Sequence, residues 1–187
     1  MRNPTLILVS AITLTLAASR AAAGRSPKAL HYYAADGSVA LPDYGKWVFL
    51  GTGLGMQYTE QAKPNPPFTT VFAEPWAYDE FMKHGVWPNK TILVAEMRKS
   101  VTNLSINKTG YAEVGDPVGV EVEIKDSAKG GWMFYDVATE TNTAKPLPQR
   151  MACYSCHAEH AAVDNTFVQF YPTLIETAKR KATYQDR

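Results

Sequence analysis

Cysteine, net charge and long apolar runs are all scarce in this sequence, and each shortage excludes a class of protein. Two cysteines in 187 residues allow one bridge at most, which excludes a scaffold held by several disulfides. The 19 basic and 18 acidic side chains nearly cancel, so nucleic acid is not an expected partner. Aromatic residues make up 11% of the chain and no block of like charge occurs, which argues against disorder.

The N-terminal segment has the three-part plan of a secretory signal peptide. Arg2 precedes an apolar run at residues 6–18, and Ala21 to Ala23 supply small residues for cleavage after Ala23. The alternative is an uncleaved membrane anchor, but the run is shorter than the ~20 residues that span a bilayer. We therefore expect a signal peptide at 1–23, one domain at 24–187, a periplasmic or secreted location and no membrane partner.

Strand patterns fill the middle of the chain and helix patterns its end. Residues 47–52, 69–73, 91–101, 118–125 and 132–137 have strand character, and 75–84 reads as a short helix between Pro75 and Gly85. After residue 150 the pattern changes, and 151–163 and 172–181 are expected to be helices. The predicted fold is α+β and predominantly antiparallel β: a curved antiparallel sheet with a short helix and a C-terminal helical segment.

Alternation also predicts which way the strand side chains point. In residues 91–101, Leu93, Ala95 and Met97 share one face of the strand. In residues 118–125 the aliphatic side chains should point to the core, whereas Glu121 and Glu123 should point to water.

Both cysteines lie in one pentapeptide, residues 153–157 (CYSCH), which is the attachment signature of c-type haem. Residues three apart share a helix face, so Cys153 and Cys156 can each form a thioether to one haem vinyl group. His157 can then bind the iron as its proximal ligand. The alternative is a disulfide or redox pair, but no thioredoxin-like βαβ unit is legible around it. One covalent haem c per chain is the predicted cofactor.

The sixth position of the iron decides what such a protein does. A Met or His ligand there makes an electron carrier, whereas an open position lets small molecules bind. The candidates are His31, His84, His160, Met56, Met82, Met97, Met133 and Met151, of which His160 and Met151 are too close to the motif to reach the opposite face of the haem.

The haem motif lies late in the chain and is followed at 161–172 by AAVDNTFVQFYP. Upstream come Leu41-Pro42, Trp47, residues 70–75 (TVFAEP), 91–96 and 132–135 (WMFY). This ordered set resembles the cytochrome P-460 family, which includes the cytochromes c′-beta, over about residues 38–180. The resemblance implies an antiparallel β fold, a homodimer and pentacoordinate haem held by Cys153, Cys156 and His157.

Within that resemblance, cytochromes P-460 proper carry a lysine bonded to the haem and oxidise hydroxylamine. This sequence has Ala95 at that position, and alanine cannot form the bond. The family also has an arginine on the distal side of the haem, and its position falls near Thr69 here, where this sequence has no arginine. The resemblance therefore places the chain nearer to cytochrome c′-beta, in which aromatic residues crowd the distal face. Phe68 and Phe72 are the candidates for that role here.

The sequence thus predicts a periplasmic monohaem cytochrome with pentacoordinate haem that binds small gases such as NO or CO. Two alternatives remain open: an oxidoreductase acting on hydroxylamine or a related small nitrogen compound, and a simple electron-transfer cytochrome. The identity of the redox partner is unknown.

Overall fold

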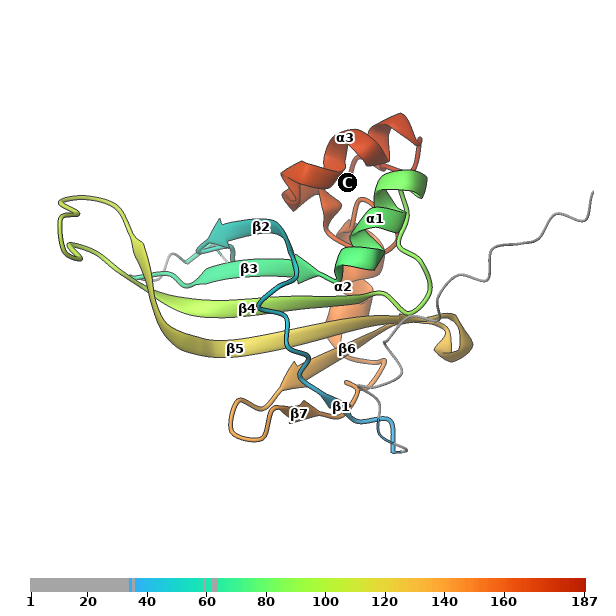
Figure 1. Ribbon diagram of the computed structural model, residues 1–187, viewed down its shortest axis with the longest axis horizontal. Coiled ribbons are helices and arrows are strands. Elements are labelled where there is room, and N and C mark those ends of the chain that lie inside the picture. Colours follow the sequence, from blue (N-terminus) through green and yellow to red (C-terminus); the bar gives the residue numbers. More distant parts are fainter. Residues whose placement is uncertain (1–33, 35, 59, 62–63) are drawn as a thin grey trace, which may run out of the picture.

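The computed structural model describes residues 34, 36–58, 60–61 and 64–187, which form an α+β fold that is mostly antiparallel strand, as predicted (Figure 1). The signal peptide expected at 1–23 and the candidate ligand His31 lie outside the described residues. The larger sheet has the strand order β2-β3-β4-β5-β6, and a small second sheet pairs β1 with β7. The strands are β1 (Val39–Ala40), β2 (Val48–Leu54), β3 (Phe68–Ala73), β4 (Ile92–Val101), β5 (Ala112–Asp126), β6 (Gly131–Val137) and β7 (Thr143–Ala144), and the helices are α1 (Pro75–His84), α2 (Ala152–His160) and α3 (Pro172–Arg180).

A hydrophobic core lies on each face of the larger sheet. On one face Leu50, Leu93 and Phe134 pack with residues of α1, of α3 and of the segment that joins α2 to α3. On the other face the side chains of β4, β5 and β6 pack with β1, β7 and residues 41–47. Figure 1 shows the three helices gathered on one side of the sheet and the β1–β7 pair on the other. The motif at 153–157 therefore lies on the helical side.

The helix at Pro75–His84 has the predicted bounds. Pro75 fits the first turn because its missing N–H has no partner there. Gly85 ends the helix with a left-handed φ of 75°, and its N–H donates to the Phe81 carbonyl at 2.7 Å. None of the helices in the described part of the chain is long and apolar enough to cross a membrane.

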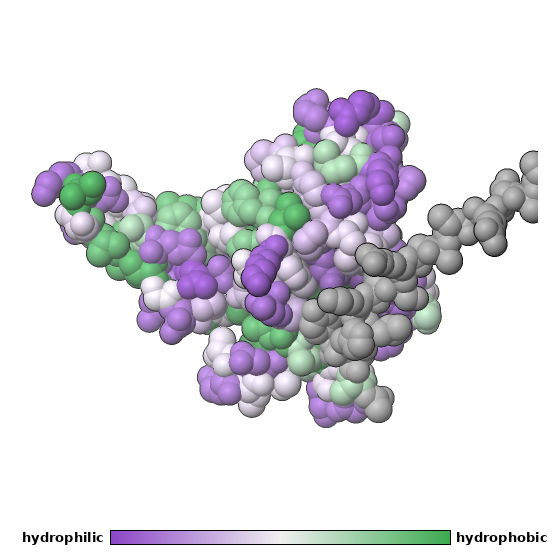
Figure 2. Space-filling view, viewed as in Figure 1, coloured by the Kyte–Doolittle hydropathy of each residue, from purple (hydrophilic) through white to green (hydrophobic). Residues whose placement is uncertain are grey.

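The β4–β5 hairpin extends beyond the other strands. β3 pairs with residues 93–98 of β4, and β6 pairs with residues 120–126 of β5, so the turn between them has no third strand beside it. Figure 2 shows apolar side chains on this projection. They are Leu104, Ile106, Tyr111 and Val118, which are between 42% and 90% exposed.

A bulge in β2 brings the chain end onto the sheet. The register of β2 against β3 shifts between Phe49 and Gly51, so that Leu50 and Gly51 are consecutive buried residues. A Cβ at Gly51 would lie 2.6 Å from the carbonyl oxygen of Phe170. The absence of a side chain here lets the segment before α3 rest directly on β2, which places Phe170 and Tyr171 over the sheet.

We expect Gly51→Ala to lower the free energy of unfolding by about 2 kcal/mol, because the new methyl group must push the Phe170 carbonyl away. Gly45→Ala is the matched control, since its Cβ would meet Asp43 at an ordinary 3.7 Å. Urea denaturation of both variants measures the difference. Equal unfolding free energies of the two variants would show that the segment before α3 can move aside without a loss of stability.

Candidate functional site

The CYSCH motif lies on α2 and faces the sheet with one side of the helix. Cys153, Cys156 and His157 are partly buried, whereas Ala152 and Ser155 are exposed. The spacing of three and four residues produces this common face, as the sequence predicted. The two cysteines are not joined by a disulfide, and burial raises the pKa of the Cys153 thiol. The structure therefore brings the two thiols and the imidazole together on the helical side of the sheet.

α2 ends at His160, three residues before the predicted end, because a distant side chain caps it. The Gln169 amide donates to the His160 carbonyl at 2.7 Å and accepts from the Ala162 N–H at 3.0 Å. These bonds satisfy backbone groups that would otherwise lack partners at the end of the helix. The extended backbone of Ala161 then turns the chain back toward the motif.

His157 is held on three sides. Its ring centroid lies 4.4 Å from that of Phe134 on β6 and 4.4 Å from that of Phe167. Its Nδ1 lies 2.9 Å from the backbone carbonyl oxygen of Asn165, so the proton must sit on Nδ1 for this bond to form. Burial lowers the pKa of His157, which the hydrogen bond to Asn165 partly opposes. The imidazole is therefore favoured in its neutral form, with the Nε2 lone pair free.

The Asn165 carbonyl is positioned by a tight turn anchored in the core. Asp164 and Asn165 have φ values of 49° and 56°, which is the left-handed region that Asp and Asn tolerate. The buried Thr166 hydroxyl donates to the Val163 carbonyl across the turn, and Trp87 Nε1 donates to the same hydroxyl at 2.9 Å. The orientation of His157 thus depends on a core tryptophan far away in the sequence.

Two adjoining cavities lie between α2 and the sheet, with volumes of about 440 and 560 Å³. Both cysteines of the motif line the larger cavity, and the smaller one reaches under the segment that precedes α3. Four residues line both: Tyr58, Glu121, Glu123 and His157. The smaller cavity is also lined by Gly51, Met56, Thr69, Val71, Ala95, Phe167, Phe170 and Tyr171, and the larger by Phe134, Cys153, Cys156 and His160.

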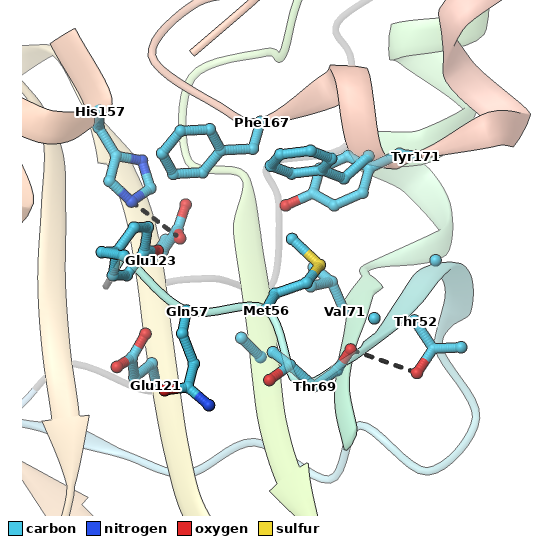
Figure 3. A pocket seen from close by; sticks show the side chains of 15 residues that line it. Thr52, Met56, Gln57, Thr69, Val71, Glu121, Glu123, His157, Phe167 and Tyr171 are labelled. Carbon is cyan, nitrogen blue, oxygen red and sulfur yellow. Dashed lines mark hydrogen bonds and ion pairs between the residues drawn. The ribbon is translucent and has the colours of Figure 1, made fainter. Parts of the chain in front are cut away.

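The sheet forms the wall opposite His157 through one row of paired residues. Gly51 pairs with Val71, Val71 with Ala95, and Ala95 with Glu121, each on a neighbouring strand. Figure 3 shows Val71 and Thr69 on this wall, below His157, Phe167 and Tyr171. The predicted face of β4 is confirmed for Ala95, which lines the cavity. The wall is thus small and apolar on β3 and β4 and acidic on β5.

The prediction that Phe68 and Phe72 crowd this wall is wrong. They alternate with Thr69 and Val71, so they point to the opposite face of the sheet. Phe72 packs there against Tyr44, with ring centroids 5.6 Å apart.

The prediction that Glu123 points to water is wrong, because its face of β5 forms the floor of both cavities and its side chain is partly buried. Glu121, on the same face, is exposed as predicted, although it also lines both cavities. Glu123 Oε1 lies 3.8 Å from His157 Nε2, and Oε2 is buried with no hydrogen-bond partner in the structure. Burial and the neighbouring Glu121 raise the pKa of Glu123 to about 8. Burial and Asp136 also raise the pKa of Glu121, against the opposing effect of His157.

Of the candidate iron ligands, the structure brings Met56 to the cavity that His157 faces (Figure 3). His84 lies on α1 beside Glu80, and the thioether of Met82 accepts a hydrogen bond from Thr177. The remaining described candidates lie outside the smaller cavity, although His160, on α2 itself, lines the larger one.

These residues fit a haem. Two thiols three residues apart and a neutral imidazole face cavities walled by Phe134, Phe167 and other apolar side chains, which suits a large planar ring. Cys153, Cys156 and His157 would hold such a group, and the unpartnered oxygen of Glu123 indicates that the cavity is built around something polar as well.

Comparison with known proteins agrees with this site. The profile of the Cytochrome P460 family matches residues 41–168, which is more than half of the chain and includes the motif on α2 and the strands that form the cavity wall. No curated protein matches the sequence. The protein therefore belongs to the Cytochrome P460 family and is a c-type haem protein.

Proposed function

We propose that the protein is a periplasmic monohaem cytochrome that binds a small gas such as NO or CO at pentacoordinate haem. Cys153 and Cys156 form the covalent attachment and His157 is the single axial ligand from the chain. The observation that carries the proposal is the wall facing His157, where Val71 and Ala95 offer no donor atom to a metal. When bound, the haem supplies an iron whose sixth position is open to a diatomic ligand. Export and a homodimer, which the family resemblance implies, belong to the same proposal.

The polypeptide orients the imidazole of His157 and limits access to the smaller cavity. The Asn165 carbonyl fixes the His157 proton on Nδ1, and hydrogen bonding there increases the basicity of Nε2 as a ligand. Phe134 and Phe167 pack at tilted angles against the imidazole of His157 and limit its rotation. Phe170 and Tyr171 cover the smaller cavity from above, which restricts it to small ligands.

The structure offers less support for a hydroxylamine oxidoreductase with a lysine cross-link. No lysine lines either cavity in the described part of the chain. Lys90, the nearest lysine before Ala95, forms an ion pair with Asp126 at 2.6 Å. Lys99, the nearest one after it, is exposed beyond the bulge between Met97 and Lys99.

An electron carrier is the second candidate, and one observation favours it. Met56 lies in the smaller cavity, with its sulfur folded back against Gly53. A thioether is a soft ligand of haem iron and occurs with histidine in electron-transfer cytochromes c.

The purified ferrous protein should show a high-spin absorption spectrum that changes on addition of CO. Its colour should remain with the polypeptide in acidified organic solvent, because two thioethers hold the pigment. Cys153→Ala and Cys156→Ala together should release it. A low-spin spectrum that is indifferent to CO would contradict gas binding, and extractable pigment in the unmodified protein would contradict covalent attachment.

Replacement of Met56 separates the two candidate functions. If the haem is pentacoordinate, Met56→Leu should leave the ferrous spectrum high-spin and change CO affinity by less than about threefold, since leucine has a similar volume. Met97→Leu is the control, because Met97 packs against Gly119 outside both cavities. A conversion from low to high spin in Met56→Leu alone would establish the electron carrier instead.

Asn165→Val should disturb the proximal ligand, because a β-branched residue resists the left-handed φ of 56°. We expect a loss of about 1–2 kcal/mol in the free energy of unfolding and a rise in reduction potential as the bond to His157 weakens. Asn165→Gly should keep both close to the original values, because glycine adopts this backbone freely. Voltammetry and urea denaturation measure the two effects. An unchanged potential in Asn165→Val would show that the carbonyl does not tune His157.

A further inference from the structure

Two carboxylates reach the centre of the haem cavity from one strand. Glu121 and Glu123 are two residues apart on β5, so both side chains lie on the cavity face of the sheet. Figure 3 shows them beneath His157, and they belong to the small set of residues that line both cavities. A molecule bound at the free nitrogen of His157 therefore lies close to both.

No cation neutralises this pair within the cavities. Neither cavity is lined by a lysine or an arginine in the part of the chain that the structure describes. The nearest further charge is also negative, because Glu121 pairs across the strands with Asp136. The imidazole that faces them is favoured in its neutral form.

Other buried acids of the fold are treated differently. Glu96, on the opposite face of the sheet, accepts hydrogen bonds from Arg98 and from the Tyr44 hydroxyl. Asp126 is 2.6 Å from Lys90. Glu74, a further buried acid, accepts a hydrogen bond from Trp76 Nε1 at 2.9 Å. In contrast, Oε2 of the partly buried Glu123 has no hydrogen-bond partner in the described part of the chain, and no lysine or arginine lines the cavities beside Glu121.

We propose that Glu121 and Glu123 make the haem site selective by charge, so that neutral ligands bind while anionic ligands are disfavoured. The ligands admitted are neutral diatomic gases, and those weakened are small anions such as azide or nitrite. This inference rests on the proposed function, because it concerns the ligand class of the same open site.

The physical basis is the weak screening inside a cavity. Charges a few ångströms apart in a poorly hydrated site interact several times more strongly than in bulk water. A ligand that brings a negative charge to the iron meets this repulsion, whereas NO and CO do not. The exposed Glu121 supplies the negative charge, and Glu123, on the same face of β5, extends the acidic wall toward His157.

The test compares ligand binding in the ferric holoprotein and in Glu121→Gln, Glu123→Gln and the double variant. Sodium azide at constant ionic strength is the anionic probe and NO is the neutral one. Glu113→Gln is the matched control, because it removes the same charge from β5 outside both cavities. We expect azide to bind at least about tenfold more tightly to the double variant, while NO affinity changes less than about twofold and the control matches the original protein.

The haem reduction potential gives a second readout that needs no added ligand. Removal of negative charge near the iron should raise the potential in Glu121→Gln and in the double variant but not in Glu113→Gln. The inference is overturned if azide affinity and potential both stay unchanged, or if azide and NO gain affinity equally, since that would indicate wider access. Failure of the original protein to bind NO would count against gas binding, whereas the potentials would still decide the role of the carboxylates. The single variants serve the same purpose if the double variant does not fold.

Discussion

The hydrogen bond between His157 Nδ1 and the Asn165 carbonyl is the contact on which the site depends. It joins α2 to a tight turn, and the turn is fixed in the core through Thr166 and Trp87. Lys125 adds a 2.6 Å ion pair to Asp164 from the neighbouring strand. A histidine on the partly exposed surface of a short helix is thereby oriented by the most buried part of the molecule. The groups that hold His157 in place belong to the hydrophobic core or are anchored in it, so changes in core packing alter the orientation of the imidazole directly.

The two faces of the central sheet show how one strand pattern can serve two purposes. On the face away from the helices, the aliphatic side chains of β5 form a closed core with β1 and β7. On the helical face the same strand places Glu121 and Glu123 in the cavity. Desolvation of these carboxyls costs stability, which their raised pKa values reflect. Proteins keep such groups mainly where function requires them.

Much of this fold follows from local sequence patterns. Pro75 and Gly85 mark the bounds of α1, and alternation correctly groups Ala95 with Leu93 on one face of β4, which the structure shows to be the helical side. The same alternation could not show that Glu121 and Glu123 line a cavity, because a strand face that meets open water and one that lines a polar cavity have the same alternating pattern. Phe68 and Phe72 point away from the cavity because they alternate with Thr69 and Val71 along the strand. The family resemblance alone did not indicate which of these alternating residues face the cavity. Likewise, the end of α2 depends on Gln169, a contact between segments that no helix pattern contains.

The bulge at Leu50 and Gly51 also bears on how the sheet ends. β2 is an edge strand, with β3 as its only partner in the larger sheet, and such an edge presents free backbone groups to any other extended chain. The bulge interrupts the regular spacing of those groups midway along the strand. An incoming strand could therefore align with only part of β2. The bulge that lets the segment before α3 rest on β2 thus also discourages the edge-to-edge pairing of sheets into fibrils.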